Sequence, residues 1–137
     1  MADDPLVRAA REAQARAYAP YSKYPVGAAL EADDGRVFVG ANVENASYGL
    51  GICAERSAVS AAVTAGALRF RRIVVVSDSE PPATPCGACR QVLAEFGGDL
   101  VVEAVGPRSA GRWRLDDLLP AAFRRATLDA AAPRPVA

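Results

Sequence analysis

Apolar residues recur every three or four positions near the start of the chain, with charged residues between them. The recurring positions are Leu6, Ala10, Ala13 and Ala17. This spacing is typical of an amphipathic helix, which Asp3 or Asp4 can cap with Pro5 in the first turn. The segment "PYSKYP", residues 20–25, ends the pattern with a proline at each end. We therefore predict a first helix that begins near residue 5.

The pattern then changes to the short apolar runs that are typical of strands. Residues 26–32 and 36–42 favour two strands, and the Asp-Gly pair of "DDGR" between them indicates a hairpin turn. Residues 71–78 favour a strand whose unbroken apolar run, Ile73 to Val76, suits burial on both faces. Two further strands are predicted at 100–105 and 112–115. The chain should therefore build one sheet.

Helical patterns alternate with these strands. Residues 53–65 favour a helix that ends before Gly66, and residues 86–96 favour another that ends before Gly97. A terminal helical stretch is expected at 116–128, followed by a frayed tail over about residues 128–137. Strand, helix, strand, helix is the order of an α/β layer fold.

Composition and charge narrow the class of protein. With 137 residues, 51% hydrophobic, the chain can bury one core, so we expect a single domain over residues 1–137. Sixteen basic and sixteen acidic residues cancel, which argues against a nucleic acid or an anionic membrane as partner. The N-terminus lacks the apolar core of a signal peptide, and no apolar run reaches membrane-spanning length. We expect a cytoplasmic protein.

Three cysteines carry the candidate chemistry. An odd number of cysteines in a reducing compartment favours metal binding or catalysis over a disulfide framework, and the sequence has no histidine. Cys53 opens the helix predicted at 53–65, while Cys86 and Cys89 lie in the first turn of the helix predicted at 86–96. Free N–H groups at helix starts favour thiolates, which bind metal. Three thiolates at two helix starts would suit Zn²⁺.

The ligand count indicates a catalytic metal. A structural zinc site is normally closed by four protein ligands, and this sequence offers three cysteines and no histidine. A carboxylate or water must take the fourth place. When water does, zinc lowers its pKa from about 15.7 to about 7, so that hydroxide forms at neutral pH. Glu55 can accept that proton, and Arg56 can offset the excess charge by donating hydrogen bonds toward the sulfurs.

The motif "CAE" followed by "PCGAC" matches the three-cysteine form of the zinc deaminase signature. Together with "PYSKYPVGAAL" and "NVENASYGLGICAERSAV", it closely resembles the short, tetrameric cytidine deaminases from about Tyr18 to Phe123. The resemblance implies a three-layer α/β/α fold with a five-stranded mixed sheet and one zinc per chain. It also implies hydrolysis of cytidine and deoxycytidine to uridine and deoxyuridine, with release of ammonia.

The resemblance assigns roles to individual residues. It makes Cys53, Cys86 and Cys89 the zinc ligands and Glu55 the proton shuttle. The residues that it places against the nucleoside are Asn42 and Glu44 on the ribose, Ala54 and Tyr24 on the base, and Ala46, Tyr48 and Phe123 from neighbouring subunits of a homotetramer. Tyr24 departs from the pattern, because phenylalanine is expected there.

Other interpretations of these residues were weighed against this one. The cysteines could be buried small side chains, and "PCGAC" alone could be a thioredoxin-like redox pair. Asn42 and Glu44 could form a polar turn, Arg56 a solvated helix position, and Tyr24 and Phe123 core aromatics. The rival functions are a blasticidin-type or polynucleotide cytosine deaminase and, from another class, a zinc-stabilised binding module. An open ligand position beside Glu55 argues against the binding module.

Overall fold

Five strands form one mixed sheet in the computed structural model, which describes residues 3–135. The strands are β1 Gly27–Ala32, β2 Val37–Ala41, β3 Phe70–Val76, β4 Val101–Val105 and β5 Ala110–Arg114. Their order across the sheet is β2-β1-β3-β4-β5. Strands β3 and β4 are parallel, and the other neighbours are antiparallel. The five predicted strands and the mixed sheet are confirmed.

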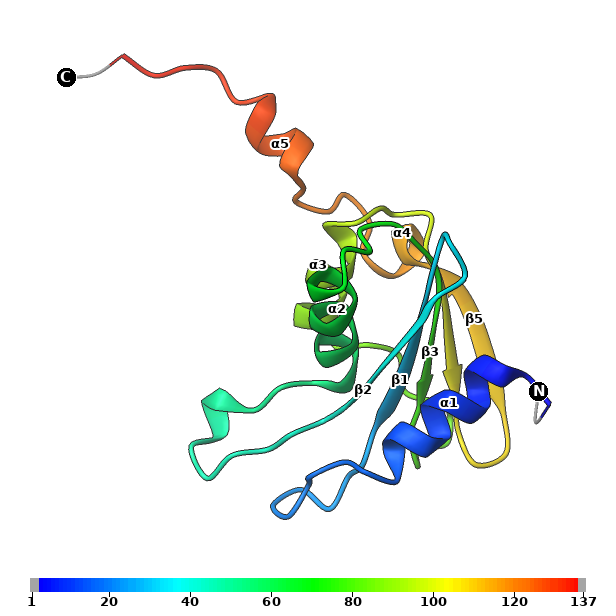
Figure 1. Ribbon diagram of the computed structural model, residues 1–137. Coiled ribbons are helices and arrows are strands. Elements are labelled where there is room, and N and C mark those ends of the chain that lie inside the picture. The colour runs from blue at the N-terminus through cyan, green and yellow to red at the C-terminus, as the bar shows by residue number, and fades with distance from the viewer. Residues whose placement is uncertain (1–2, 136–137) are drawn as a thin grey trace.

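Helices cover both faces of this sheet (Figure 1). The helices are α1 Pro5–Gln14, α2 Ala54–Thr64, α3 Gly87–Ala94, α4 Leu115–Leu118 and α5 Arg125–Asp129, with a 3-10 turn η1 at Tyr48–Leu50. Helix α1 lies on one face, and α2 and α3 lie together on the other. The three-layer α/β/α arrangement is therefore confirmed. Within residues 3–135, no helix is long and apolar enough to cross a membrane.

The central strand β3 contributes to the core on both of its faces. Ile73 and Val75 are buried in the cluster that includes α2 and α3, whereas Val74 and Val76 are buried in the cluster that includes α1. Successive side chains of a strand point to opposite faces, so an unbroken apolar run is required when helices cover both. The run from Ile73 to Val76 was predicted on this ground.

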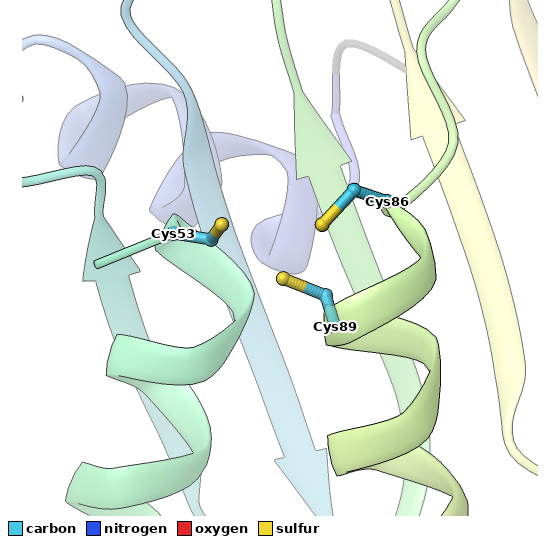
Figure 2. A group of neighbouring side chains, drawn as sticks. All are labelled: Cys53, Cys86 and Cys89. Atoms are coloured by element: carbon cyan, nitrogen blue, oxygen red, sulfur yellow. The ribbon is translucent and has the colours of Figure 1, made fainter. Parts of the chain in front are cut away.

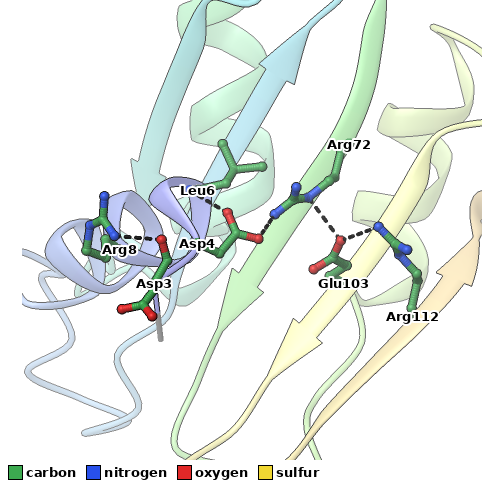
Figure 3. Close-up of polar contacts among 7 residues, drawn as sticks. All are labelled: Asp3, Asp4, Leu6, Arg8, Arg72, Glu103 and Arg112. Atoms are coloured by element: carbon green, nitrogen blue, oxygen red, sulfur yellow. Dashed lines mark hydrogen bonds and ion pairs between the residues drawn. The ribbon is translucent and has the colours of Figure 1, made fainter. Parts of the chain in front are cut away.

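Helix α1 is fixed to the sheet by its capping residue. Asp4 accepts a hydrogen bond from the Leu6 N–H at 2.9 Å, which settles the prediction between Asp3 and Asp4. The same carboxylate pairs with Arg72 of β3, whose Nε lies 2.9 Å from a Glu103 carboxylate oxygen on β4 (Figure 3). Arg112 of β5 extends this row of ion pairs, 3.0 Å from Glu103. Helix α1 is thus tied to three strands.

The first helix ends earlier than its apolar pattern predicts. Helix α1 stops at Gln14, so Ala17 lies outside it and is half-buried. The Tyr18 N–H donates to the Asn42 carbonyl, and the Glu44 N–H donates to the Tyr18 carbonyl. These bonds pair the chain with the segment after β2, in an extended geometry that a helix cannot adopt.

The C-terminal stretch is two short helices instead of the single stretch predicted at 116–128. Pro120 has no N–H to donate, and Leu119 before it has left the helical conformation, at φ −138° and ψ 70°. Helix α4 therefore ends at Leu118, and α5 begins at Arg125. Helix α5 and the segment after it stand away from the sheet (Figure 1). Of the predicted tail, residues 128–129 are in α5, 130–135 are exposed, and 136–137 lie outside the described residues.

Candidate active site

The three cysteines lie at the starts of two neighbouring helices. Cys53 is the N-cap of α2, Cys86 is the N-cap of α3, and Cys89 lies one turn into α3. Figure 2 shows their sulfur atoms directed into the space between these two helix starts. Gly40 of β2 allows α2 to approach, because a Cβ at that position would lie 2.4 Å from the Ala54 carbonyl oxygen. The predicted convergence of two helix starts is confirmed.

The sulfur atoms have the spacing of a metal site. The three Sγ atoms all lie within 4.8 Å of one another. In a tetrahedral site with Zn–S bonds of about 2.3 Å, thiolates lie about 3.8 Å apart. A small shift of the side chains would therefore let all three bind one ion. Three thiols with no nitrogen donor suit zinc in particular, because zinc binds soft sulfur ligands readily.

The electrostatic surroundings of the thiols differ. Burial raises the pKa of Cys86, but hydrogen bonds from the Cys89 N–H, from the Cys89 and Cys53 side chains and from the Ala88 N–H together outweigh it, so that this pKa lies below its ordinary value. Burial raises the pKa of Cys53 and of Cys89, and the negative charge of Glu55 adds to the rise in both. Three thiolates in this small space would repel one another. A divalent cation between them is the natural compensation.

Glu55 follows Cys53 by two residues and is turned inward from the first turn of α2. It is 5% exposed, and burial raises the pKa of its carboxyl, partly offset by its own backbone N–H. A carboxyl with a raised pKa can both accept and return a proton near neutral pH. Glu55 thus lies next to the thiols, at the place where the sequence analysis expects the proton shuttle.

A cavity of about 240 Å³ lies between these residues and the ends of strands β1, β2 and β3. Its lining consists of Tyr24, Val26, Asn42, Cys53, Ala54, Glu55, Val75, Ser77, Ala83, Thr84 and Cys86. Six of the predicted site residues are in this set, and Cys89 is buried next to it. The sequence interpretation missed Ser77 and Thr84. Ser77 had a recognisable signal, because it is the first polar residue after the buried run that ends at Val76.

Two predicted ribose-binding residues are already engaged within the chain. The Asn42 side chain donates to the Tyr24 carbonyl at 3.0 Å and accepts from the Val26 N–H at 2.8 Å. Glu44 lies outside the cavity, in a second hollow of about 310 Å³ next to Tyr48. Its carboxylate accepts from the hydroxyl and N–H of Ser22 and from the Tyr21 N–H, and these bonds lower its pKa.

The remaining predicted residues are outside the cavity. Ala46 is exposed, Tyr48 is 79% exposed and Phe123 is 55% exposed. Arg56 lines a separate groove on α2, and within residues 3–135 it makes no hydrogen bond to a sulfur. The structure of one chain therefore assembles the metal-binding end of the predicted site and leaves these four side chains on the surface.

Comparison with known proteins agrees with this geometry. The family model for the cytidine and deoxycytidylate deaminase zinc-binding region matches residues 1–104. A cytidine deaminase of Sporosarcina psychrophila is 44% identical over 129 residues, which cover 93% of this chain and 95% of the relative. One from Mycobacterium tuberculosis is 49% identical over 116 residues, which cover 83% and 84%.

A solved structure has the same fold as this chain. The crystal structure of a cytidine deaminase from Burkholderia pseudomallei superposes with a TM-score of 0.85 at 48% identity. The match covers 90% of this chain and all of that one. Because sequence, zinc-binding region and fold all agree over most of its length, the chain belongs to the cytidine deaminase family.

Proposed function

We propose that this chain is a zinc enzyme that hydrolyses cytidine and deoxycytidine to uridine and deoxyuridine, with release of ammonia. The observation that carries the proposal is the meeting of three thiols with the buried Glu55 at one cavity. Family membership over most of the chain supports the same reaction. Residues 1–137 would act as one catalytic domain. The enzyme would work in the cytoplasm, where free thiols persist.

The protein would contribute proton transfer to this reaction. Bound by Cys53, Cys86 and Cys89, zinc would supply a water activated for attack at C4 of the cytosine ring. Glu55 takes one proton of that water and delivers it to N3, where it stays in the product. Glu55 then carries the second proton to the amino group, and the C4–N bond breaks to release ammonia. The water oxygen becomes the new carbonyl, so atoms and charge balance.

The other predicted site residues would orient the nucleoside or support the metal. In this proposal the Ala54 backbone bonds the pyrimidine edge, and the Tyr24 ring lies against the base. Asn42 and Glu44 bond the ribose 3′-hydroxyl. Each retains free acceptor lone pairs beyond the bonds described above, and Asn42 has one amide hydrogen to spare. Arg56 would donate hydrogen bonds toward the cysteine sulfurs once a neighbouring chain covers the groove in which its side chain lies.

We further propose that the working unit is a homotetramer in which neighbouring chains complete each cavity. Ala46, Tyr48 and Phe123 are exposed in the single chain, and in the tetramer a neighbouring chain would cover the two aromatic side chains among them. The groove on α2 that holds Arg56 also contains small and apolar residues, such as Ala61 and Val92, that would allow close approach of another helix. The fold leaves these surfaces accessible.

A substrate panel tests the proposed function. Purified protein with measured zinc content is assayed for ammonia release from cytidine, deoxycytidine, CMP and single-stranded DNA. We expect one zinc per chain and turnover of the two nucleosides. Turnover confined to single-stranded DNA, or one zinc per chain with no turnover of any compound, would contradict the proposal.

A further inference from the structure

Tyr24 carries a hydroxyl where the family pattern leads us to expect phenylalanine, and that hydroxyl has a specific partner. Its oxygen lies 2.5 Å from the Ser79 Oγ, in a partly buried position. Such a distance is at the short end for a bond between two hydroxyls. The extra oxygen is therefore accommodated by a second polar group across the chain, 55 residues away.

The pair connects two segments that form different walls of the cavity. Tyr24 belongs to residues 20–26, between α1 and β1, and this segment lines the cavity through Tyr24 and Val26. Ser79 belongs to residues 77–85, between β3 and α3, and this segment lines it through Ser77, Ala83 and Thr84. The second segment also leads directly to Cys86. The hydroxyl pair thus joins the two walls side chain to side chain.

The other hydrogen bonds of each segment go to partners outside the opposite segment. On the first segment, the Tyr24 carbonyl accepts from Asn42, and the Tyr24 N–H donates to the Ser22 hydroxyl. These bonds hold the backbone of Tyr24, and neither involves its ring.

On the second segment, Glu80 accepts hydrogen bonds from the β4–β5 turn, and Thr84 accepts one from Arg90. Among residues 3–135, one other side chain forms hydrogen bonds to both segments: the Gln14 amide donates to the Pro25 carbonyl at 3.2 Å and to Asp78 at 3.1 Å. That link reaches the Pro25 carbonyl and the Asp78 carboxylate but not the Tyr24 ring, whose hydroxyl is bonded to Ser79.

We propose that the Tyr24–Ser79 hydroxyl pair determines the affinity of this site for its nucleoside, by holding the aromatic wall in one orientation before the base arrives. The inference rests on the proposed function, in which the Tyr24 ring lies against the base. A ring that is already ordered loses little conformational entropy when a ligand packs on it, whereas a freely turning ring must be ordered at that moment. Tyr24 and Ser79 are positioning residues in this account.

The test is a double-variant cycle with Tyr24→Phe, Ser79→Ala and the two combined. Each single variant should raise KM for cytidine about fivefold, the size expected from one neutral hydrogen bond, with kcat within about twofold. The combined variant should be no worse than either single one, because both remove the same bond. Zinc content should stay at one per chain. Tyr18→Phe is the matched control, since the Tyr18 side chain is 56% exposed and does not line the cavity.

An unchanged KM in Tyr24→Phe, or effects that multiply in the combined variant, would overturn the inference. Hydrogen exchange gives a readout that needs no turnover: peptides from residues 77–85 should exchange faster in Tyr24→Phe and Ser79→Ala than in the parent chain. Equal exchange would also overturn it. A parent chain that binds zinc but turns over no nucleoside would instead contradict the proposed function, and exchange would still decide whether the pair joins the walls.

Discussion

The residues that line the metal-binding cavity and the exposed residues proposed to bind the nucleoside are placed differently in the fold. Cys53, Cys86 and Glu55 are fixed at the starts of α2 and α3, and the structure brings them together from two distant parts of one chain. Tyr48 and Phe123, assigned to the nucleoside, lie on η1 and after α4, where both are exposed. Residues carried by packed helices need no partner to reach their places. In the proposed tetramer, residues carried by surface loops would reach their places only against a neighbouring chain.

The difference has a simple physical origin. Helices α2 and α3 bury Ala58, Ala62 and Leu93 in the core, so their starts cannot move without opening it. The segment that carries Tyr48 is held by a few backbone bonds around Val43 and Ile52, and its large side chains face outward. We therefore expect substitutions at the helix starts to abolish the chemistry and substitutions on the loops to weaken binding through a neighbour.

The largest effect is expected from Cys86→Ala. Two thiols and no histidine cannot hold zinc tightly, so we expect loss of the metal and of detectable deamination. Because a metal that ties α2 to α3 also contributes folding free energy, the variant should unfold at a lower temperature. Metal analysis and thermal unfolding measure both. As a control, parent protein stripped by a chelator should regain activity with added zinc, while the variant should not; full zinc retention by the variant would remove Cys86 from the ligand set.

Glu55→Gln should separate metal binding from proton transfer at the same helix start. The amide keeps the size of the side chain but cannot carry a proton, so zinc should remain and kcat should fall by about a hundredfold or more. Glu95→Gln, at the exposed end of α3, is the matched control and should behave as the parent chain. If Glu55→Gln were slowed less than about tenfold, another group would have to carry the proton.

Phe123→Ala should have a smaller effect, confined to nucleoside binding. We expect KM to rise about tenfold with zinc unchanged, because a lost aromatic contact weakens binding without touching the metal. Mixing Phe123→Ala subunits with Glu55→Gln subunits tests whether the cavity is shared. Some activity should return in mixed tetramers, where an intact Phe123 meets an intact Glu55. A fully active monomer by sedimentation at assay concentration, or no recovery in confirmed mixed tetramers, would contradict a shared cavity.

Much of the fold followed from short-range patterns in the sequence. The two helices that begin after Cys53 and Cys86 were predictable, because apolar residues recur in each at helical spacing. Gly66 and Gly97, both at positive φ, mark where these helices end. The early end of α1 was not predictable from its apolar spacing, because it depends on pairing of Tyr18 with a segment more than twenty residues away. Long-range pairing of this kind leaves no periodic signal.

The site shows the same division. The spacing of the three cysteines and Glu55 sufficed to place them together, because each lies at a helix start. Ser79 had no such signal, since its importance comes from a contact with Tyr24 across two loops. The exposed positions of Tyr48 and Phe123 were anticipated only through the family resemblance, which assigned them to neighbouring chains.

The smallest effect is expected on the sheet face opposite the active site, at Asp4. Although burial raises its pKa, the Leu6 N–H and Arg72 hold that pKa below its ordinary value, so the carboxylate is charged at neutral pH. Its stabilising contribution should therefore be present at neutral pH and lost as pH falls through the lowered pKa. Asp4→Ala removes both the helix cap and the ion pair, and should lower the free energy of unfolding by about 1 kcal/mol.

Asp4→Asn is the variant that divides this effect into its parts. Asparagine caps a helix about as well as aspartate, so it should keep the bond to Leu6 and lose only the charge that faces Arg72. Arg72 retains Glu103 as a partner, and the loss should therefore be less than about 1 kcal/mol. Denaturant unfolding at neutral pH with saturating zinc measures both variants against the parent chain. Neither should alter KM for cytidine or zinc content, because α1 and the cavity lie on opposite faces of the sheet, and a changed KM in Asp4→Asn would show that the two faces are coupled.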